Sequence, residues 1–600
     1  MIAPRDRVSA RRVDDSSAPV HPLGSRAKVL LVNVFGPYAC DDQYGSRTLN
    51  PMELYQNQVT RVQGPFSLRM FHRTWGLMLI QANIAAPCTV LDFPTLDRFI
   101  AELREHQYDV VGISAIAPNL LKAKKMCELV RQYLPQATIV VGGHIANAAD
   151  LHRRLDADYI VQGEGVRWFR RFFGEDEEQP IRHPLIASGV GTRTFGVTAK
   201  EQQGDVAAAL IPSVGCPMGC NFCSTSAMFG GKGNCIHFYQ TGDELFDVMC
   251  QLEQQMHVQS FFVMDENFLL HRKRALRLLE LMEQHQKAWE LDVFSSANVL
   301  RSYTMEQLVR LGISWVWMGI EGRDSRYGKL HGADTFALVR QLQSHGIRVL
   351  GSTIIGLENH APENFDEAID YAVRHHTDFH QFMLYMPIPG TPLHAELAAQ
   401  GRMKDESEYS PADIHGQYIF NYRHAHIPQG QETEFLLRAF ERDFAENGPS
   451  IARLTATLLA GWKRYKNDPD PCIRRRFAWE VRELPSTYSA VVGACKLYYR
   501  KNPAMHAKMS ALLKDLYREF GWKSRFFGEI GGRWLLRKVR QEEKRLAAGW
   551  TYEPPTFYER NAACTEQPAA ALCRYVTPRV LPPPSAPHAT VKIGEAVAVG

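Results

Sequence analysis

The sequence lacks the features of a membrane-spanning or secreted protein. None of its apolar runs reaches the roughly 18 residues that a bilayer-spanning helix needs. The first 25 residues carry Arg, Asp, Ser and Pro but no apolar segment of the kind found in secretory signals. We therefore expect residues 1–25 to be a disordered leader, and we expect a cytoplasmic protein without a transmembrane segment.

The sequence also lacks a strong charge imbalance and a disulfide pattern. Its formal net charge is +4 over 600 residues, which gives no argument for a nucleic-acid partner. Most of the 12 cysteines are scattered along the chain, a pattern that fits a reducing compartment. Hydrophobic residues make up 45% and charged residues 22%, as in folded proteins, and a chain of this length needs two or three cores.

Strand and helix patterns alternate five times between residues 26 and 175. Short β-branched runs begin at Lys28, Thr89, Val110, Thr138 and Tyr159, and helical patterns lie between them, the first over residues 67–84. This alternation predicts a doubly wound parallel sheet with helices on both faces. Small or polar residues follow the strands, where such folds bind ligands: Ser114, Gly142, Gly143, Gly163 and Glu164. A tight turn accounts for each glycine on its own equally well.

Three cysteines with C-x3-C-x2-C spacing follow an apolar run that ends at Val214. They are Cys216, Cys220 and Cys223. Three thiolates on one short loop can hold three irons of a 4Fe–4S cluster and leave the fourth iron open. The Cys-x-x-Cys half alone could equally be a zinc or dithiol site. Cys235 and Cys250, nearby in sequence, show no further ligand spacing, and we expect them to be core or bystander residues.

Six strand–helix units follow between residues 201 and 400, fewer than the eight of a closed barrel. This count predicts a partial (β/α)6 barrel, in which chemistry gathers where strands end. Polar residues and a glycine lie at these ends: Asp265, Glu266, Ser295, Arg301, Glu321 and Gly356. Two alternatives stay open at this point, because Arg301 could make a surface ion pair and the acidic pair could cap the next helix.

The cysteine spacing resembles the cluster loop of the radical S-adenosylmethionine (SAM) enzymes. The glycine-rich strand ends of the first domain resemble the cobalamin-binding domain that precedes many radical SAM cores, so the likeness covers about residues 26–400. It implies a 4Fe–4S cluster on the three cysteines and a cobalamin held by the five strand-end residues of the first domain. It also implies that SAM contacts Phe222 and the six strand-end positions of the barrel. One departure is that residues 41–45 offer no Asp-x-His-x-x-Gly motif; this leaves open a degenerate domain without corrinoid.

The resemblance implies that a reduced cluster cleaves SAM to a 5′-deoxyadenosyl radical, with cobalamin-dependent methylation of an unactivated carbon as the outcome. An electron donor such as flavodoxin or ferredoxin is then a partner, and the substrate is a small molecule, lipid or peptide. A non-methylating cyclisation, rearrangement or carbon–carbon bond formation is an alternative, and a cluster- or corrinoid-based sensor is another. The sequence names no catalytic residue beyond the cofactor contacts.

After residue 400 the strand pattern ends, and apolar residues recur at helical spacing. We expect a helical domain over residues 401–553, after a linker over residues 176–200, and a disordered tail over residues 554–600. Residues 533–540 form a basic amphipathic stretch. The helices could cap the barrel mouth, contact a membrane surface or, as a smaller prospect, contact RNA, although no nucleic-acid partner is expected overall.

Overall fold

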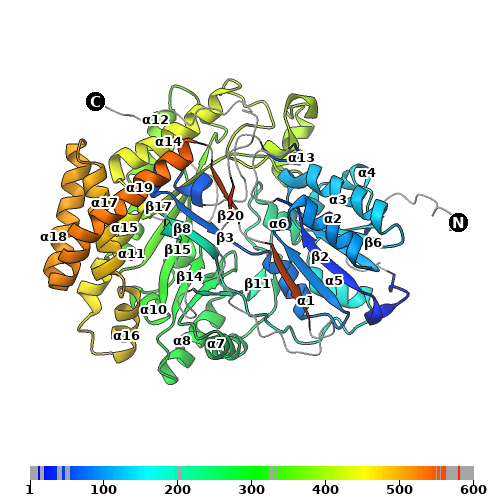
Figure 1. Cartoon of the computed structure of the whole chain (residues 1–600), viewed down its shortest axis with the longest axis horizontal. Helices are drawn as coiled ribbons and strands as arrows, with labels where there is room; N and C mark the ends of the chain where they lie inside the picture. Colours follow the sequence, from blue (N-terminus) through cyan, green and yellow to red (C-terminus); the bar gives the residue numbers. More distant parts are fainter. Residues whose placement is uncertain are drawn as a thin grey trace.

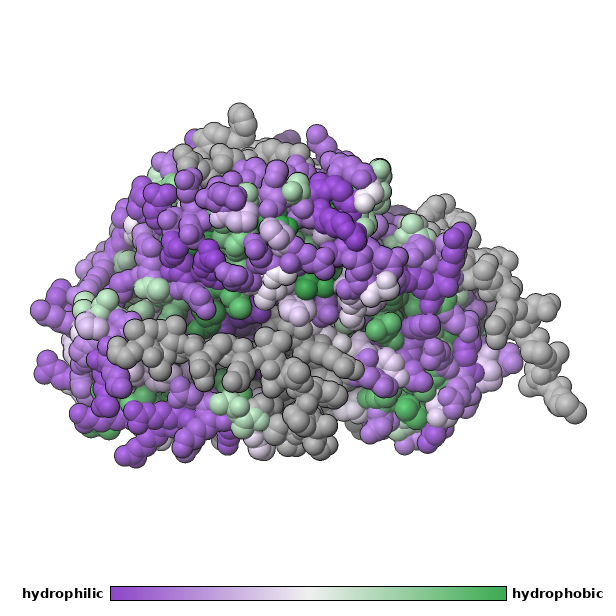
Figure 2. All heavy atoms as spheres, turned by 90° about the horizontal axis from the view of Figure 1, so that it is seen from above, coloured by the Kyte–Doolittle hydropathy of each residue, from purple (hydrophilic) through white to green (hydrophobic). Residues whose placement is uncertain are grey.

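A computed structural model describes the fold in three parts that follow one another along the chain (Figure 1). It describes residues 11–13, 19–36, 43–46, 55–195, 197–198, 206–322, 330, 334–548, 550–553, 556–561 and 579–581. Among these residues, no helix is long and apolar enough to cross a membrane. The face seen in Figure 2 is mainly hydrophilic, with hydrophobic residues scattered over it.

The first part is a seven-stranded sheet with the order β1-β7-β6-β5-β2-β4-β19. Its central strands are β2 (Val29–Asn33), β4 (Cys88–Asp92), β5 (Val110–Ser114), β6 (Thr138–Gly142) and β7 (Tyr159–Val161), all parallel. Their chain order across the sheet is 2-1-3-4-5, a doubly wound arrangement that binds ligands where the order reverses, between β2 and β5.

Alternate residues of these strands enter two cores. Leu30 and Val32 pack under α2 (Leu96–Glu105) and α3 (Leu120–Tyr133). Leu31 packs on the opposite face, under α1 (Trp75–Ala82) and α5 (Gly165–Phe172). The doubly wound fold predicted from the sequence is thereby confirmed.

The helix predicted over residues 67–84 is wrong in its first half. Leu68–Phe71 is strand β3, which pairs antiparallel with β8 (Val190–Thr194), and the helix α1 begins only at Trp75. The apolar spacing of this segment suits both structures, and a partner strand more than 100 residues away decides between them. The segment leaves the first domain and reaches the barrel.

The central part is a six-stranded parallel sheet whose strands follow the chain order, as predicted. The strands are β10 (Ala208–Leu210), β13 (Ser260–Val263), β14 (Glu290–Phe294), β15 (Ile313–Glu321), β16 (Arg348–Ile355) and β17 (Phe379–Leu384). Helices α7 (Gly242–Met256), α8 (Arg272–Gln284), α10 (Met305–Arg310), α11 (Thr335–Ser344) and α12 (Phe365–Val373) alternate with them. Each strand therefore ends on the same edge, the mouth of a partial barrel.

The helices that follow the barrel are α14 (Gln431–Asn447), α15 (Ser450–Tyr465), α16 (Pro471–Glu480), α17 (Ser489–Tyr498), α18 (Pro503–Phe526) and α19 (Gly532–Ala547). Two of them, α15 and α16, close the end of the barrel opposite its mouth. Arg476 of α16 donates to the carbonyls of Val309 and Ile313, where β15 begins. Thr457 of α15 donates to Asp378 at the start of β17. The interpretation of these helices as a cap over the mouth is therefore wrong for α15 and α16.

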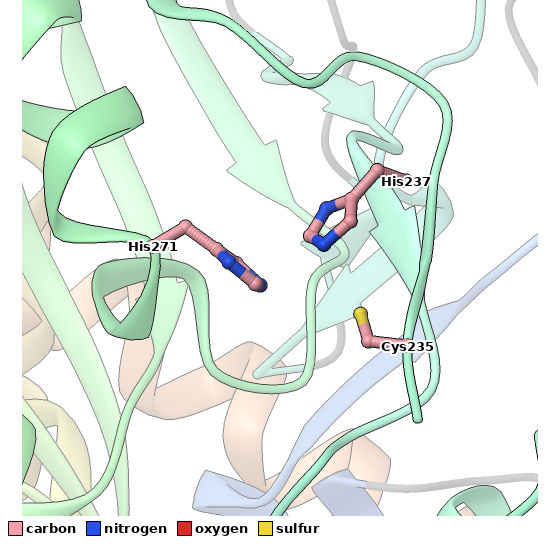
Figure 3. Close-up of side chains that lie close together, drawn as sticks. All are labelled: Cys235, His237 and His271. Carbon is pink, nitrogen blue, oxygen red and sulfur yellow. The ribbon is translucent and has the colours of Figure 1, made fainter. Parts of the chain in front are cut away.

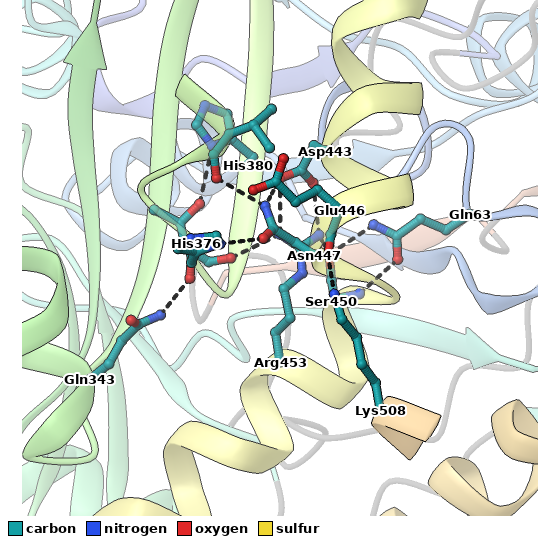
Figure 4. Close-up of polar contacts among 12 residues, drawn as sticks. Gln63, Gln343, His376, His380, Asp443, Glu446, Asn447, Ser450, Arg453 and Lys508 are labelled. Carbon is teal, nitrogen blue, oxygen red and sulfur yellow. Dashed lines mark hydrogen bonds and ion pairs between the residues drawn. The ribbon is translucent and has the colours of Figure 1, made fainter. Parts of the chain in front are cut away.

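A polar network fixes this closure (Figure 4). Asp443 and Arg453 form a buried ion pair of 2.8 Å, and Arg453 also donates to the carbonyl of Thr377 before β17. Gln63, from the segment that leaves the first domain, exchanges two hydrogen bonds with Ser450 at the start of α15. All three parts of the chain thus meet at one end of the barrel.

Part of the expected disordered tail is structured. Strand β19 (Phe557–Arg560) pairs antiparallel with β4 and covers that edge of the first sheet. Glu559 forms a 2.7 Å ion pair with Arg73, whose guanidinium lies 4.1 Å from the centre of the Phe557 ring. At the other edge, residues 11–13 of the expected leader form β1, parallel to β7. Without these two strands, β4 and β7 would be edge strands with unpaired backbone groups. Local strand propensity in the terminal segments does not reveal that they pair with these edges.

Candidate active site

The three cysteines lie on one loop between β11 (Ser213–Val214) and α6 (Ser224–Met228). β11 pairs with β12 (Ile236–His237), so the loop leaves from and returns to the same hairpin. Gly219 has a φ of +67°, and a Cβ there would lie 2.4 Å from the Cβ of Lys232. Lys232 belongs to the segment that leads back to β12 and packs against the loop. Only glycine therefore allows this loop to fold so tightly.

The thiols fit an iron–sulfur cluster in position and in chemistry. All three are half-buried, and Cys223 is the N-cap of α6, its sulfur 3.4 Å from the Ser226 N–H. Burial, together with the nearby Cys223, Glu266 and Cys220, raises the pKa of Cys216 to about 11. Burial also raises the pKa of Cys223. Both of these thiols therefore stay neutral without a bound cation, and binding of iron would supply the charge that stabilises thiolates.

Of the two acidic residues after β13, Asp265 has a carboxylate that is already hydrogen-bonded to other groups of the protein. Both of its oxygens accept hydrogen bonds, from Ser213, Arg274 and the backbone N–H of Asn267. The Arg274 pair measures 2.6 Å and is almost fully buried. Asp265 therefore joins β11, β13 and α8, and a direct contact with SAM becomes less suitable for it than for its neighbour.

Glu266 and Glu321 have the properties of ligand-binding carboxylates. Glu266 is accessible to solvent, yet burial within the surrounding protein, with the repulsion of Asp265, raises its pKa to about 7. Glu321 ends β15 with a φ of +59°, a conformation that costs a non-glycine residue about 1–2 kcal/mol. Such strain collects at functional sites, and a break in the β15–β16 register accompanies it.

The remaining predicted SAM contacts lie at the same mouth but differ in exposure. Ser295 is buried and donates to Asn267, whereas Arg301 is exposed at the end of α9 (Ala297–Leu300). Gly356 has a φ of +82°, and a Cβ there would lie 2.4 Å from the Phe420 ring. Phe222 is half-buried and packs edge-on against Tyr385 at 6.1 Å. Phe420 borders the mouth, and no motif in the sequence predicts it there.

All five predicted cobalamin contacts line one cavity of about 170 Å³ at the strand ends of the first sheet. A Cβ on Gly163 would meet no atom within 4 Å, so a side chain there would enter the open space. The wall on the other side comes from the cluster hairpin and loop, a contribution that the strand and helix patterns did not predict: Val214, Met228, Phe229 and Phe238. The lining of this cleft is mostly apolar, which suits an aromatic part of a cofactor such as the benzimidazole of cobalamin.

Two of the five residues have a sufficient role in the fold alone. Glu164 is the N-cap of α5 and accepts from the backbone N–H groups of Val166 and Arg167. Gly143 has a φ of +84°, and a Cβ there would lie 2.5 Å from the Ala115 carbonyl oxygen. They shape the cavity floor without needing to bind a ligand themselves. Of the segment at 41–45, residues 41–42 lie outside the described part of the chain.

The first domain touches the cluster loop directly. Asn147, in η5 (His144–Asn147), donates to the backbone carbonyl of Ser224, and His144 lies 3.3 Å from the Thr225 hydroxyl. Leu393, in the loop and helix that follow β17, donates its backbone N–H to the Asn221 carbonyl. The cluster loop is therefore held between the first domain and the last strand of the barrel.

Two protein families match these two regions. The B12 binding domain matches residues 72–172, and the radical SAM superfamily matches residues 210–372. The chain is a radical SAM enzyme that carries a B12-binding domain, and its cofactors are a 4Fe–4S cluster, SAM and cobalamin.

Among curated proteins, the chain is similar to several methyltransferases and cyclases. It is 26% identical to the bacteriochlorophyllide d C-12(1)-methyltransferase of Chlorobaculum tepidum over 50% of this chain and 68% of the relative. It is 23% identical to an uncharacterized methyltransferase of Pyrococcus horikoshii, over 48% and 70% of the two chains. It is also 23% identical to the anaerobic magnesium-protoporphyrin IX monomethyl ester cyclase of Cereibacter sphaeroides, over 53% and 58%.

Proposed function

We propose that this enzyme methylates a carbon atom of a hydrophobic substrate. The observation that carries the proposal is that one cavity has strand ends of the B12-binding domain on one side and the cluster loop on the other. When bound, the cluster and SAM supply a 5′-deoxyadenosyl radical, and cobalamin supplies a methyl group. The methyltransferases among the relatives support the same reaction class.

In this proposal Cys216, Cys220 and Cys223 hold the cluster, and Glu266 and Glu321 bind the polar end of SAM. Arg301, Phe222, Ser295 and Gly356 border the same ligand. Ser114, Gly142 and Gly163 give the cobalamin access to the sheet edge, while Asp265, Gly143 and Glu164 hold the geometry around them. An external one-electron donor, such as flavodoxin or ferredoxin, completes the system.

A hydrophobic substrate is favoured by the inner face of the barrel. Trp317 stacks on Phe294 and Trp315 stacks on Phe379, each at 5.0 Å between ring centres. The two tryptophans and Phe294 line a cavity of about 120 Å³, whose polar lining residues are Tyr55, His72, Ser188 and Asp292. Aromatic walls of this kind bind carbon-rich, flat groups through apolar burial.

The test is anaerobic reconstitution with iron, sulfide and methylcobalamin, followed by product analysis with SAM and a panel of lipid and tetrapyrrole substrates. We expect 5′-deoxyadenosine, S-adenosylhomocysteine and a methylated product in matched amounts. Cys220→Ala should abolish all three. The supplied methylcobalamin serves the first turnover, so formation of 5′-deoxyadenosine over several turnovers without S-adenosylhomocysteine would refute methyl transfer.

Cyclisation is the second candidate, because cyclases are among the relatives. It predicts a product with an unchanged carbon count and one new ring. A protein that holds its cluster, SAM and cobalamin but never yields 5′-deoxyadenosine would contradict both reactions and favour a sensor.

A further inference from the structure

Three metal-ligating side chains converge beside the cluster hairpin (Figure 3). They are Cys235 and His237, which flank Ile236 on the returning strand β12, and His271, directly before α8. One ligand atom from each lies within 4.8 Å of the other two. Cys235 and His237 are two residues apart on an extended segment, so both side chains leave the same face. The expectation that Cys235 is a core or bystander residue misses this arrangement, and its side chain is only half-buried.

Packing alone accounts for part of this arrangement but not all of it. The two imidazoles meet edge-on at 4.3 Å, and the Cys235 sulfur lies 3.6 Å from the Gly215 carbonyl oxygen, within reach of a weak hydrogen bond. The Nδ1 atom of His237, however, is buried and has no hydrogen-bond partner among the described residues. A buried nitrogen without a partner is destabilising, and a metal ion bound to it would remove that penalty.

The donor set identifies the type of ion. One thiolate and two imidazoles form a borderline-soft set that suits Zn²⁺, with a fourth position left for water. A single thiol cannot hold a cubane cluster, so this group is distinct in kind from the three-cysteine loop. The nearest charged groups to the two imidazoles are Arg274 and Asp265. The charge of Arg274 itself is balanced by Asp265 at 2.6 Å.

We propose that Cys235, His237 and His271 bind one zinc ion, which fastens the base of the cluster hairpin to the start of α8. β12 pairs with β11, and Cys216 follows β11 by two residues. A zinc ion at this point would fix the position of the cluster loop independently of the cluster. This site does not depend on which reaction the enzyme catalyses.

The first test is metal analysis of the full-length protein, reconstituted with iron, sulfide and zinc and then dialysed against a weak chelator. We expect about one zinc per chain in addition to about four irons. Cys235→Ala and His271→Ala should lose the zinc and keep the iron and sulfide. Cys250→Ala, which removes another half-buried cysteine in the same region, should keep both metals.

A second measurement covers the case in which these variants fold poorly. Co²⁺ added to the zinc-free wild-type protein should give a thiolate-to-cobalt absorption band that zinc abolishes. The band should disappear when Cys235 alone is replaced by serine. A wild-type protein without chelator-resistant zinc and without this band would overturn the proposal, as would equal zinc content in wild type and Cys235→Ala.

An independent feature lies on the C-terminal helices at the far side of the molecule from the first domain (Figure 1). Trp522, Phe526, Ile530 and Trp534 are spaced by four residues and are 80%, 48%, 54% and 53% exposed. Gly521, with a φ of +66°, breaks α18 and lets a new helix start at Trp522. The π turn η11 (Phe527–Gly531) takes more residues per turn than an α-helix, which reduces the drift of this spacing around the helix. The four side chains therefore form one exposed apolar stripe.

Basic residues accompany the stripe along the same helices: Lys523, Arg525, Arg533, Arg537 and Lys538. Tryptophan beside arginine and lysine is typical of helices that lie in the interface of a membrane, where cations attract anionic headgroups. We infer that this stripe docks on an anionic bilayer surface, where a hydrophobic substrate would be found. The location of the substrate in the bilayer rests on the proposed function, whereas the docking of the stripe does not.

Sedimentation of the full-length protein with vesicles tests the docking. We expect binding to phosphatidylcholine vesicles that contain phosphatidylglycerol, weaker binding to phosphatidylcholine alone, and release by salt. Trp522→Ser with Trp534→Ser should lower binding at least about tenfold, because each tryptophan adds apolar area to the interface. Leu23→Ser, at another exposed apolar residue, is the matched control. Three results would overturn membrane docking, whatever the substrate proves to be: equal vesicle binding by the double tryptophan variant and Leu23→Ser, no vesicle binding by the wild type, or dimerisation through the stripe.

Discussion

Gly390 provides a test of how the two cofactor domains are aligned. It lies in the loop between β17 and α13 (Pro392–Ala399), with a φ of +88°. A Cβ at this position would lie 2.3 Å from the carbonyl oxygen of Asn147, and Asn147 is the residue of η5 that donates to the cluster loop. Ordinary contact needs about 3.5 Å, so Gly390→Ala should separate the B12-binding domain from the barrel by about 1 Å.

Gly401→Ala separates this displacement from backbone strain. Gly401 has a φ of +66°, but a Cβ there would meet no atom within 4 Å. Both variants carry the cost of a left-handed alanine, about 1–2 kcal/mol, and only Gly390→Ala adds the displacement. Because a misplacement of about 1 Å can slow a reaction by up to about 100-fold, we expect at least tenfold less product from Gly390→Ala than from Gly401→Ala.

The assay compares three quantities in both variants: iron and sulfide content, cobalamin binding by absorption, and product formed per 5′-deoxyadenosine. The first two should match the wild type, and the last should fall only in Gly390→Ala. If both variants give the same product ratio, the contact between Gly390 and Asn147 does not align the domains, and the reasoning fails.

Three further predictions concern the rest of the fold. Burial raises the pKa of Asp292 to about 7, so the folded state keeps a proton that the unfolded state releases. The free energy of unfolding should therefore fall as the pH rises from about 4 to about 7, by at most about 1.4 kcal/mol per pH unit, and Asp292→Asn should remove this slope in denaturant titrations. Ending the chain after residue 555 removes β19 and should destabilise the first domain by about 2–4 kcal/mol, with aggregation visible by light scattering, whereas ending it after residue 561, which keeps β19, should not. Gly143→Ala should weaken cobalamin binding at least about tenfold in absorption titrations, and Gly64→Ala, at an open position with φ +54°, should leave it unchanged. Unchanged cobalamin affinity in Gly143→Ala would contradict the location of the cleft.

The sequence was sufficient for the order of elements and for the cluster loop, because both are local. Strand and helix periods appear within ten to fifteen residues, and the three cysteines lie within eight. Pairings between distant segments could not be predicted from the sequence. Strand β3 pairs with β8, and β4 pairs with β19, which lies more than 450 residues later in the chain. Local apolar spacing carries no information about such partners.

The division of roles between Asp265 and Glu266 shows the same limit within the site. Both follow β13 and have the same charge, so the sequence places them equally at the barrel mouth. Arg274, nine residues later, turns back and pairs with Asp265, which leaves Glu266 accessible. Only the three-dimensional path of α8 distinguishes a carboxylate that holds the structure from one that can meet a ligand.

The pairing of β19 with β4 has a consequence for how this chain folds during synthesis. The first domain begins near the N-terminus, yet one edge of its sheet is covered by residues 557–560. On the ribosome the edge of β4 stays without this partner strand until residue 560 has emerged. A chaperone or the barrel itself would have to shield that edge in the meantime, and a fragment limited to the B12-binding region should be prone to self-association. The first sheet is therefore complete only after residues 557–560 have been made.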